Sequence, residues 1–160
     1  MINAIMHGCN GKMGQVITGL AAEDQEIRIV AGVDAFDQEQ VTYPVFSSLE
    51  ECTVEADVVI DFSAAPAVDE LLAACIQKKL PCVLCTTGLS GEQLQRVQEA
   101  SEQIAVLKSA NMSLGINMLL QLLKEAAGLL APAGFDIEIV EKHHNQKIDA
   151  SSWYWNRLQT

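Results

Sequence analysis

The first fourteen residues constrain the fold most, because a short apolar run is followed directly by three evenly spaced glycines. The run extends from Ile2 to Met6, and its length suits one buried parallel strand. The glycines are Gly8, Gly11 and Gly14. Apolar residues then recur at helical spacing, at Met13, Val16, Ile17 and Leu20. The pattern therefore predicts a strand, a glycine-rich bend and a helix.

A bend of this kind suits the pyrophosphate of a dinucleotide. Missing side chains let the backbone approach the phosphates, and the N–H groups at the start of the helix stabilise negative charge. The candidate cofactor-binding residues of the bend are Gly8, Cys9, Asn10, Gly11, Lys12, Met13 and Gly14. A second apolar run, Ile27 to Val33, leads to Asp34, which lies 20 residues after Gly14 and suits the hydroxyls of the adenosine ribose. The alternative is an ordinary strand, turn and helix with no ligand.

Composition narrows the class of protein. A chain of 160 residues suits one domain, and its net charge of -11 disfavours nucleic acid and anionic membranes as partners. No apolar segment is long enough to span a membrane, and the first residues do not resemble a signal peptide, so we expect a cytoplasmic protein. Five cysteines, an odd number, suggest free thiols. Cys82 and Cys85 have redox or zinc spacing, but they fall within an expected strand and no second Cys/His pair follows, so we expect no metal site.

From the first residues to about Val140, strand-like and helix-like patterns alternate, which predicts a Rossmann-like α/β fold with a doubly wound parallel sheet. The further expected strands are 56–60, 82–85, 104–107 and 135–140. The expected helices are 66–78, one beginning near Ser90 with a capping box, and 114–130. In the last of these, Met118, Leu119, Leu122 and Leu123 form a stripe that is typical of a core.

Two loops follow expected strands and should share the edge of the sheet that holds the glycine bend. One contains Asp61, Phe62 and Ser63, and the other contains Thr86, Thr87 and Gly88. Hydroxyl and N–H groups of the second loop suit a ribose or a nicotinamide amide. The same loop also reads as a turn before a capped helix, and both interpretations can hold together.

The segment from Glu141 to Asp149 has the densest cluster of functional groups, including His143, His144 and Lys147. In an acidic chain, such a cluster suits the binding of a small polycarboxylate and the protonation of a reacting centre. The alternative is a solvated surface segment without a partner.

Together these motifs resemble the dihydrodipicolinate reductase family, NAD(P)H-dependent enzymes of bacterial lysine (diaminopimelate) biosynthesis. The resemblance depends on 8–14, 61–63, 86–88, 110–116 and above all on the pattern Glu-x-His-His-x-x-Lys-x-Asp at 141–149. It implies that His143 and Lys147 are the catalytic pair, with Lys147 donating a proton, and that His144 and Ser152 bind substrate carboxylates. It also implies that Ala110, Asn111 and Met112 lie near the nicotinamide, and that the family forms homo-tetramers.

The resemblance leaves the choice between NADH and NADPH open. Asp34 favours a free 2′-hydroxyl and hence NADH, whereas Lys12 stands where a basic residue could meet a 2′-phosphate, so we expect dual use.

The chain departs from the family pattern at three places. Cys85 stands where a glycine is usual, and Asn111 stands where a proline is common. After Ala150 the sequence diverges, and both tryptophans fall within 153–155. We therefore expect a dinucleotide-binding domain over 1–140, the start of a substrate-binding segment and an aberrant tail over 141–160, and a second domain that is largely missing. The two functional hypotheses are the reductase and an inactive NAD(P)-binding fragment of it; an unrelated oxidoreductase fits the His-His-x-x-Lys pattern less well.

Overall fold

The computed structural model describes residues 1–36, 41–138 and 140. The chain divides into two compact units, of which one ends at Ala110 and the other begins at Asn111. The expected domain boundary near residue 140 adjoins residues outside the described ranges and stays a prediction.

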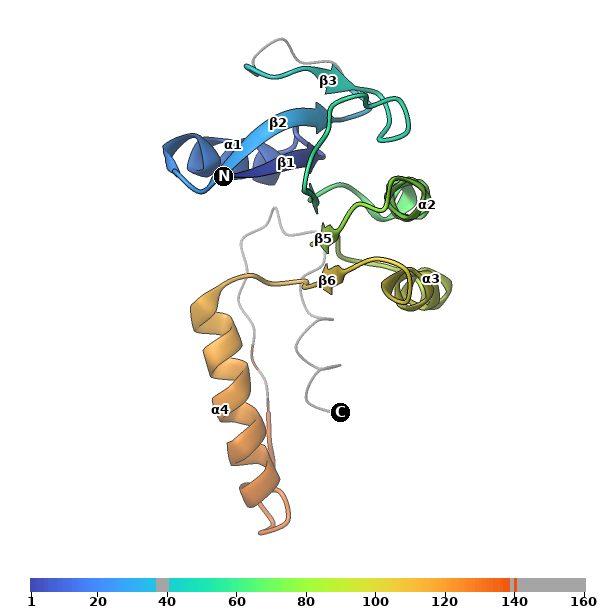
Figure 1. Ribbon diagram of the computed structural model, residues 1–160. Coiled ribbons are helices and arrows are strands. Elements are labelled where there is room, and N and C mark those ends of the chain that lie inside the picture. Colours follow the sequence, from blue (N-terminus) through green and yellow to red (C-terminus); the bar gives the residue numbers. More distant parts are fainter. Residues whose placement is uncertain (37–40, 139, 141–160) are drawn as a thin grey trace. The chain divides into compact units, whose positions relative to one another are not determined.

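The first unit contains a six-stranded sheet in the order β3-β2-β1-β4-β5-β6, and every neighbouring pair of strands is parallel (Figure 1). The strands are β1 (Ile2–His7), β2 (Ile27–Val33), β3 (Val45–Phe46), β4 (Val58–Asp61), β5 (Cys82–Leu84) and β6 (Val106–Lys108). The strand order reverses between β1 and β4, so the predicted doubly wound Rossmann-like sheet is confirmed.

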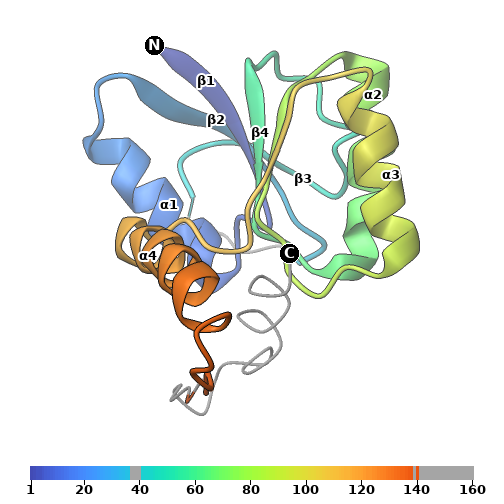
Figure 2. The same cartoon turned by 90° about the horizontal axis from the view of Figure 1, so that it is seen from below.

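Helices cover both faces of this sheet. α1 (Lys12–Glu23) packs on β1 and β2, whereas α2 (Val68–Lys78) and α3 (Gly91–Ser101) lie together on the opposite face (Figure 2). A short 3₁₀ turn, η1 (Ala65–Ala67), precedes α2. This arrangement follows from right-handed crossovers, because β1 to β2 runs in one direction across the sheet and β4 to β5 to β6 runs in the other.

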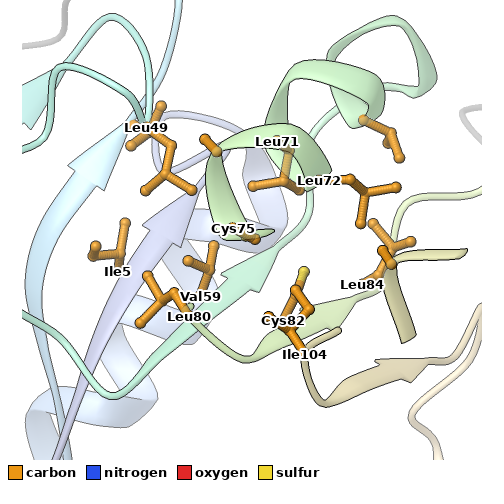
Figure 3. Close-up of a cluster of buried hydrophobic side chains, with 14 of the residues drawn as sticks. Ile5, Leu49, Val59, Leu71, Leu72, Cys75, Leu80, Cys82, Leu84 and Ile104 are labelled. Carbon is orange, nitrogen blue, oxygen red and sulfur yellow. The ribbon is translucent and has the colours of Figure 1, made fainter. Parts of the chain in front are cut away.

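The main core lies between the sheet and α2–α3 (Figure 3). Ile5 and Val59 from the two central strands meet Leu71 and Leu72 from α2, and all four are buried. The inward face of α2 is made of Val68, Leu71, Leu72 and Cys75, all of which are buried. Full burial of a leucine side chain contributes about 2 kcal/mol, so this face alone fixes α2 against the strands.

The expected capping box at Ser90 is also confirmed. The Ser90 hydroxyl accepts from the backbone N–H of Gln93, and the Gln93 side chain accepts from the backbone N–H of Ser90. The Gln93 amide also donates to the carbonyl of Ala65 at 2.7 Å, which joins the start of α3 to η1. An ion pair between Arg96 and Asp69 links α3 to α2 on the surface.

The second unit contains α4 (Leu114–Leu130), whose bounds agree with the prediction. The Ser113 hydroxyl caps it by accepting from the backbone N–H of Ile116. The expectation that the Met/Leu stripe of α4 is core is wrong, because exposed fractions along it range from 38% at Leu123 to 63% at Met118. Periodicity shows which face of a helix needs cover, but it does not show that the cover is present. Among the described helices, none is both long and apolar enough to cross a membrane.

The expected strand at 135–140 is also wrong, since residues 135–138 pair with none of the described strands. Alternation of apolar and acidic residues produces a strand only where a neighbouring backbone completes the hydrogen bonds. The other expected elements agree with the described ones to within two residues at their ends, and Pro66 lies in η1 rather than in the helix. The two-residue strand β3 was not among the expected strands.

Candidate functional site

The glycine bend between β1 and α1 requires glycine at two of its three positions. Gly8 has φ of +80°, and a Cβ there would lie 2.8 Å from the carbonyl oxygen of Phe62. A Cβ on Gly14 would lie 2.2 Å from the carbonyl oxygen of Gly8. The first glycine thus permits the tight turn, and the last lets the helix pack close against it. The N-cap of α1 is Gly11, and the first residues of the helix, Lys12 and Met13, are exposed.

Cys9 lies beneath this bend and has no exposed surface. Its sulfur fills the space beside Gly32, where a Cβ would lie only 2.6 Å from Sγ. Burial, with a smaller effect from the charge of Asp34, raises the pKa of the Cys9 thiol to about 11. The Cys9 side chain therefore supports the bend from below as a neutral packing group.

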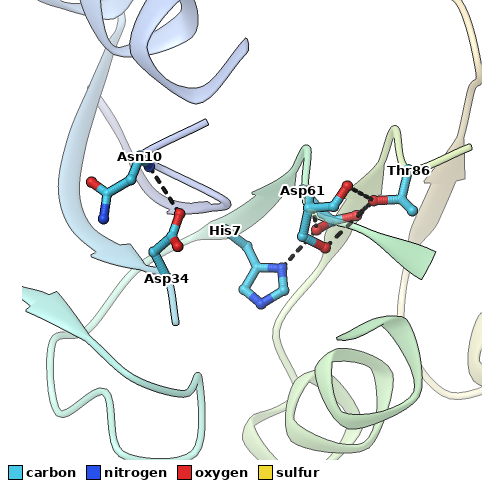
Figure 4. A network of polar contacts seen from close by, with 6 residues as sticks. His7, Asn10, Asp34, Asp61 and Thr86 are labelled. Atoms are coloured by element: carbon cyan, nitrogen blue, oxygen red, sulfur yellow. Dashed lines mark hydrogen bonds and ion pairs between the residues drawn. The ribbon is translucent and has the colours of Figure 1, made fainter. Parts of the chain in front are cut away.

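Asp34, at the carboxyl end of β2, contacts the bend directly (Figure 4). Its Oδ2 accepts from the backbone N–H of Asn10 at 2.9 Å, and its Oδ1 accepts from the backbone N–H of Phe36 at 3.1 Å. The Asn10 side chain in turn donates to the carbonyl of Phe36. A carboxylate offers about four acceptor positions, so Asp34 keeps free ones for the hydroxyls of a ligand.

A second polar network joins the carboxyl ends of three strands (Figure 4). Asp61 ends β4 and is completely buried. Its Oδ1 lies 2.6 Å from Nδ1 of His7, the last residue of β1, and accepts from the backbone N–H of Ser63 at 3.1 Å. Its Oδ2 accepts from the hydroxyl of Thr86, just after β5, at 2.6 Å. The Asp61 carboxylate therefore holds the three loops in fixed positions.

The network determines the charge of Asp61. Burial by itself would raise the pKa of this carboxyl, but hydrogen bonds from His7, Ser63 and Thr86, together with the charge of His7, lower the pKa below its usual range. Asp61 is therefore ionised at neutral pH. Sequence reasoning placed Asp61 on the rim but did not identify His7 as its partner; the available signal was a His and an Asp that each end an expected strand.

A pocket of about 800 Å³ opens between the bend, Asp34 and the start of α2. Six of the predicted cofactor-binding residues line it, namely Gly8, Asn10, Gly11, Asp34, Phe62 and Ser63. Residues that the sequence did not single out also line it, including Phe36, Glu50 and Glu70. The structure thus brings into one pocket residues that are more than fifty positions apart in the chain.

The three residues of the 86–88 loop differ in burial. Thr86 is buried and turned toward Asp61, whereas Thr87 and Gly88 are exposed. Gly88 has φ of +73°, a conformation that favours glycine. Thr86 therefore serves the framework of the site, and the next two residues are available for contacts.

The remaining predicted residues are not placed with this pocket. Ala110 ends the first unit, while Asn111 and Met112 begin the second. Asn111 accepts from the backbone N–H of Ser113 and from the side chain of Asn117, and so supports the start of α4. His143, His144, Lys147 and Ser152 lie outside the described residues, and their roles stay predictions.

Cys82 and Cys85 are free thiols with raised pKa values. Both residues are buried and unbridged. A hydrogen bond with Cys75 and burial raise the pKa of the Cys82 thiol, and burial with the charge of Asp61 raises that of Cys85 to about 11. In the part of the chain that the structure describes, no group of three or more His, Cys, Asp or Glu side chains is arranged to hold a metal ion.

This geometry fits a dinucleotide. The bend has no room for side chains at Gly8 and Gly14, a helix begins directly behind it, and a carboxylate with free acceptor positions stands beside it. The family model described as "Dihydrodipicolinate reductase, N-terminus" matches residues 2–112, and the model described as "Dihydrodipicolinate reductase, C-terminus" matches residues 115–153. The chain belongs to the dihydrodipicolinate reductase family.

Similar proteins of the family agree with this assignment. A 4-hydroxy-tetrahydrodipicolinate reductase from Caldanaerobacter subterraneus subsp. tengcongensis is 55% identical over 95% of the chain, and one from Clostridium tetani is 48% identical over 95%. The chain spans 59% of the length of each of these relatives. Among solved structures, dipicolinate-bound dihydrodipicolinate reductase from Paenisporosarcina sp. TG-14 has a TM-score of 0.78 at 29% identity, covering 99% of this chain and 64% of the other. The resemblance inferred from the motifs is thereby confirmed.

Proposed function

We propose that the chain binds NADH or NADPH and acts in the reduction of 4-hydroxy-tetrahydrodipicolinate to tetrahydrodipicolinate, a step of lysine (diaminopimelate) biosynthesis in the cytoplasm. The observation that carries the proposal is the contact between Asp34 and the glycine bend, with 2.9 Å between Oδ2 and the backbone nitrogen of Asn10. This contact places a carboxylate for ribose hydroxyls directly beside a backbone surface for phosphates. The reaction itself is inferred from membership of the reductase family.

The described residues divide the work of holding the cofactor. The missing side chains at Gly8 and Gly11 let the pyrophosphate approach the bend, and the first turn of α1 suits its charge, because the start of a helix and the helix dipole favour negative charge. Asp34 suits the adenosine ribose, and the pocket beyond it, which includes the exposed ring of Phe36, suits the adenine. The bound cofactor supplies the hydride.

The substrate side of the reaction belongs to the later segment. We infer that Lys147 provides the proton and that His143 assists it, while His144 and Ser152 hold carboxylates of a small dicarboxylate substrate. Asn111 and Met112, with Thr87 and Gly88, are proposed to contact the nicotinamide side of the cofactor. The homo-tetramer expected of the family is likewise proposed for the full-length enzyme.

A second candidate function follows from the length of the match. Because the chain spans 59% of its relatives, it can bind a dinucleotide and yet lack substrate turnover. In that case the chain is a nucleotide-binding fragment of the reductase.

Two measurements on the 160-residue chain test these proposals. Isothermal titration calorimetry with NADH and with NADPH should show saturable binding of at least one of these cofactors. Oxidation of the reduced cofactor in the presence of substrate then separates the active reductase from the binding fragment. Failure of both dinucleotides to bind would overturn the proposed function.

A further inference from the structure

We propose that this site prefers NADH to NADPH, and that Asp34, Glu50 and Glu70 determine the preference by lining the adenosine pocket with carboxylates. The inference rests on the proposed function, because it concerns the same pocket. The motifs suggest that both NADH and NADPH are used, and this inference ranks NADH above NADPH.

Three carboxylates line the pocket. Asp34 stands at the end of β2, Glu50 follows β3, and Glu70 lies in the first turn of α2. Among the described residues that line the pocket, none is Lys or Arg. NADPH would bring an additional phosphate of nearly two negative charges to the ribose, and such a group is ordinarily held by Arg or Lys. Here it would meet carboxylates.

The neighbouring sequence offers no basic side chain that could bind a 2′-phosphate in this pocket. Between Arg28 and Lys78 it contains no Lys, Arg or His, so every charged side chain in the stretch that follows β2 is acidic. The two flanking cations are engaged elsewhere, because Arg28 donates to the side chain of Asn3 at 2.8 Å and Lys78 donates to the carbonyl of Cys52 at 3.0 Å. Asn3 lies near the start of β1, at the edge of the sheet opposite the bend.

Two other basic residues, His7 and Lys12, adjoin the glycines of the bend in the sequence. His7 lines the pocket, but its Nδ1 lies 2.6 Å from Oδ1 of Asp61 and is engaged there. Lys12 opens α1 and does not line the pocket. Its position beside Gly11 suits the pyrophosphate, which NADH and NADPH share, and so it does not discriminate between them.

Asp34 also explains why NADH fits. Two of its acceptor positions are used by backbone N–H groups of Asn10 and Phe36, which hold the carboxylate in place. The remaining positions suit the two ribose hydroxyls of NADH, and a 2′-phosphate would remove one of these donors. Binding of NADH and discrimination against NADPH therefore both depend on Asp34.

The test is the ratio of the dissociation constants of NADPH and NADH, measured by calorimetry on the 160-residue chain. We expect NADPH to bind about ten- to a hundredfold more weakly, because like charges in a pocket repel. Raising the ionic strength should reduce the ratio, since salt screens charge repulsion and leaves steric effects unchanged. A ratio of one or below in the unmodified chain would overturn the inference and leave the proposed function intact; absence of binding by both cofactors would overturn both.

Matched variants locate the effect. Asp34→Asn should lower the ratio toward one, whereas Asp24→Asn, in the turn after α1, should not change it. Glu70→Gln should strengthen NADPH binding about threefold relative to NADH. Its control is Glu92→Gln, which lies in the first turn of α3 and outside the pocket. If Asp34→Asn fails to fold, the Glu70 pair and the salt series still decide the question.

Lys12→Ala tests whether Lys12 binds the pyrophosphate, which both cofactors share, or the 2′-phosphate of NADPH. We expect it to weaken NADH and NADPH by the same factor. A selective loss of NADPH binding would show that Lys12 meets the 2′-phosphate and would contradict the proposed role of the pocket.

Discussion

His7 and Asp61 end the two central strands side by side, with 2.6 Å between Nδ1 of the imidazole and Oδ1 of the carboxylate. They lie where the strand order of the sheet reverses, the place at which doubly wound folds bind their ligands. Asp61 also holds Thr86, so one buried carboxylate connects β1, β4 and the loop after β5. The polar network thus fixes the edge of the sheet on which the proposed cofactor depends.

Substitution of Asp61 by alanine should destabilise the chain by about 3 kcal/mol, because it leaves His7, Thr86 and the Ser63 N–H without their buried partner. Urea unfolding followed by circular dichroism measures the loss. Asp69→Asn is the control, since Asp69 pairs with Arg96 on the surface, where ion pairs contribute little. Equal losses in the two variants would show that the buried network is not a special source of stability.

The lowered pKa of Asp61 predicts that the free energy of unfolding decreases at acidic pH. Its pKa is lowered in the folded chain, so as pH falls the unfolded chain binds the proton first, near the usual pKa of about 3.9. The stability that Asp61 contributes is therefore complete above about pH 5 and decreases below pH 4. The free energy of unfolding should fall more steeply from pH 5 to pH 3 in the unmodified chain than in Asp61→Ala. Parallel pH profiles would contradict the assignment.

Two glycines of α1 should respond in opposite ways to the same change. Gly14→Ala places a Cβ against the backbone of Gly8 and Cys9, which cannot move aside, and should cost at least about 2 kcal/mol and weaken cofactor binding. Gly19→Ala meets no atom within 4 Å and should stabilise the helix by about 0.5 to 1 kcal/mol. Thermal unfolding of the two variants gives the comparison. A tolerated Gly14→Ala would remove the steric reason for glycine in the bend.

The sequence predicted those parts of the site that depend on local pattern. The glycine bend and Asp34 are recognisable because a tight turn, a helix start and a strand end each leave a signature in neighbouring residues. The bounds of α4 were predicted for a similar reason, since its apolar period is continuous, and the structure shows that Ser113 is its N-cap.

What the sequence did not reveal depends on pairing across space. His7 and Asp61 are 54 residues apart, and their contact requires both the order of β1 and β4 and the register between them. The acidic lining from Glu50 and Glu70 likewise depends on how the loop after β3 and the start of α2 meet at one pocket. The strand expected at 135–140 failed because its pattern lacks a described partner.

The exposed face of α4 leads to a prediction about assembly. Met118, Leu119 and Leu122 lie on one stripe and are 63%, 47% and 53% exposed, so we expect the chain to self-associate through this stripe. Sedimentation velocity over a range of concentrations should show an increasing mean mass. Leu122→Gln should raise the dissociation constant about tenfold, because burial of a leucine contributes about 1.5 to 3 kcal/mol. Gln121→Ala, off this stripe, is the matched control and should have no effect. A chain that stays monomeric at all concentrations would contradict the prediction, and an equal response of the two variants would place the contact elsewhere.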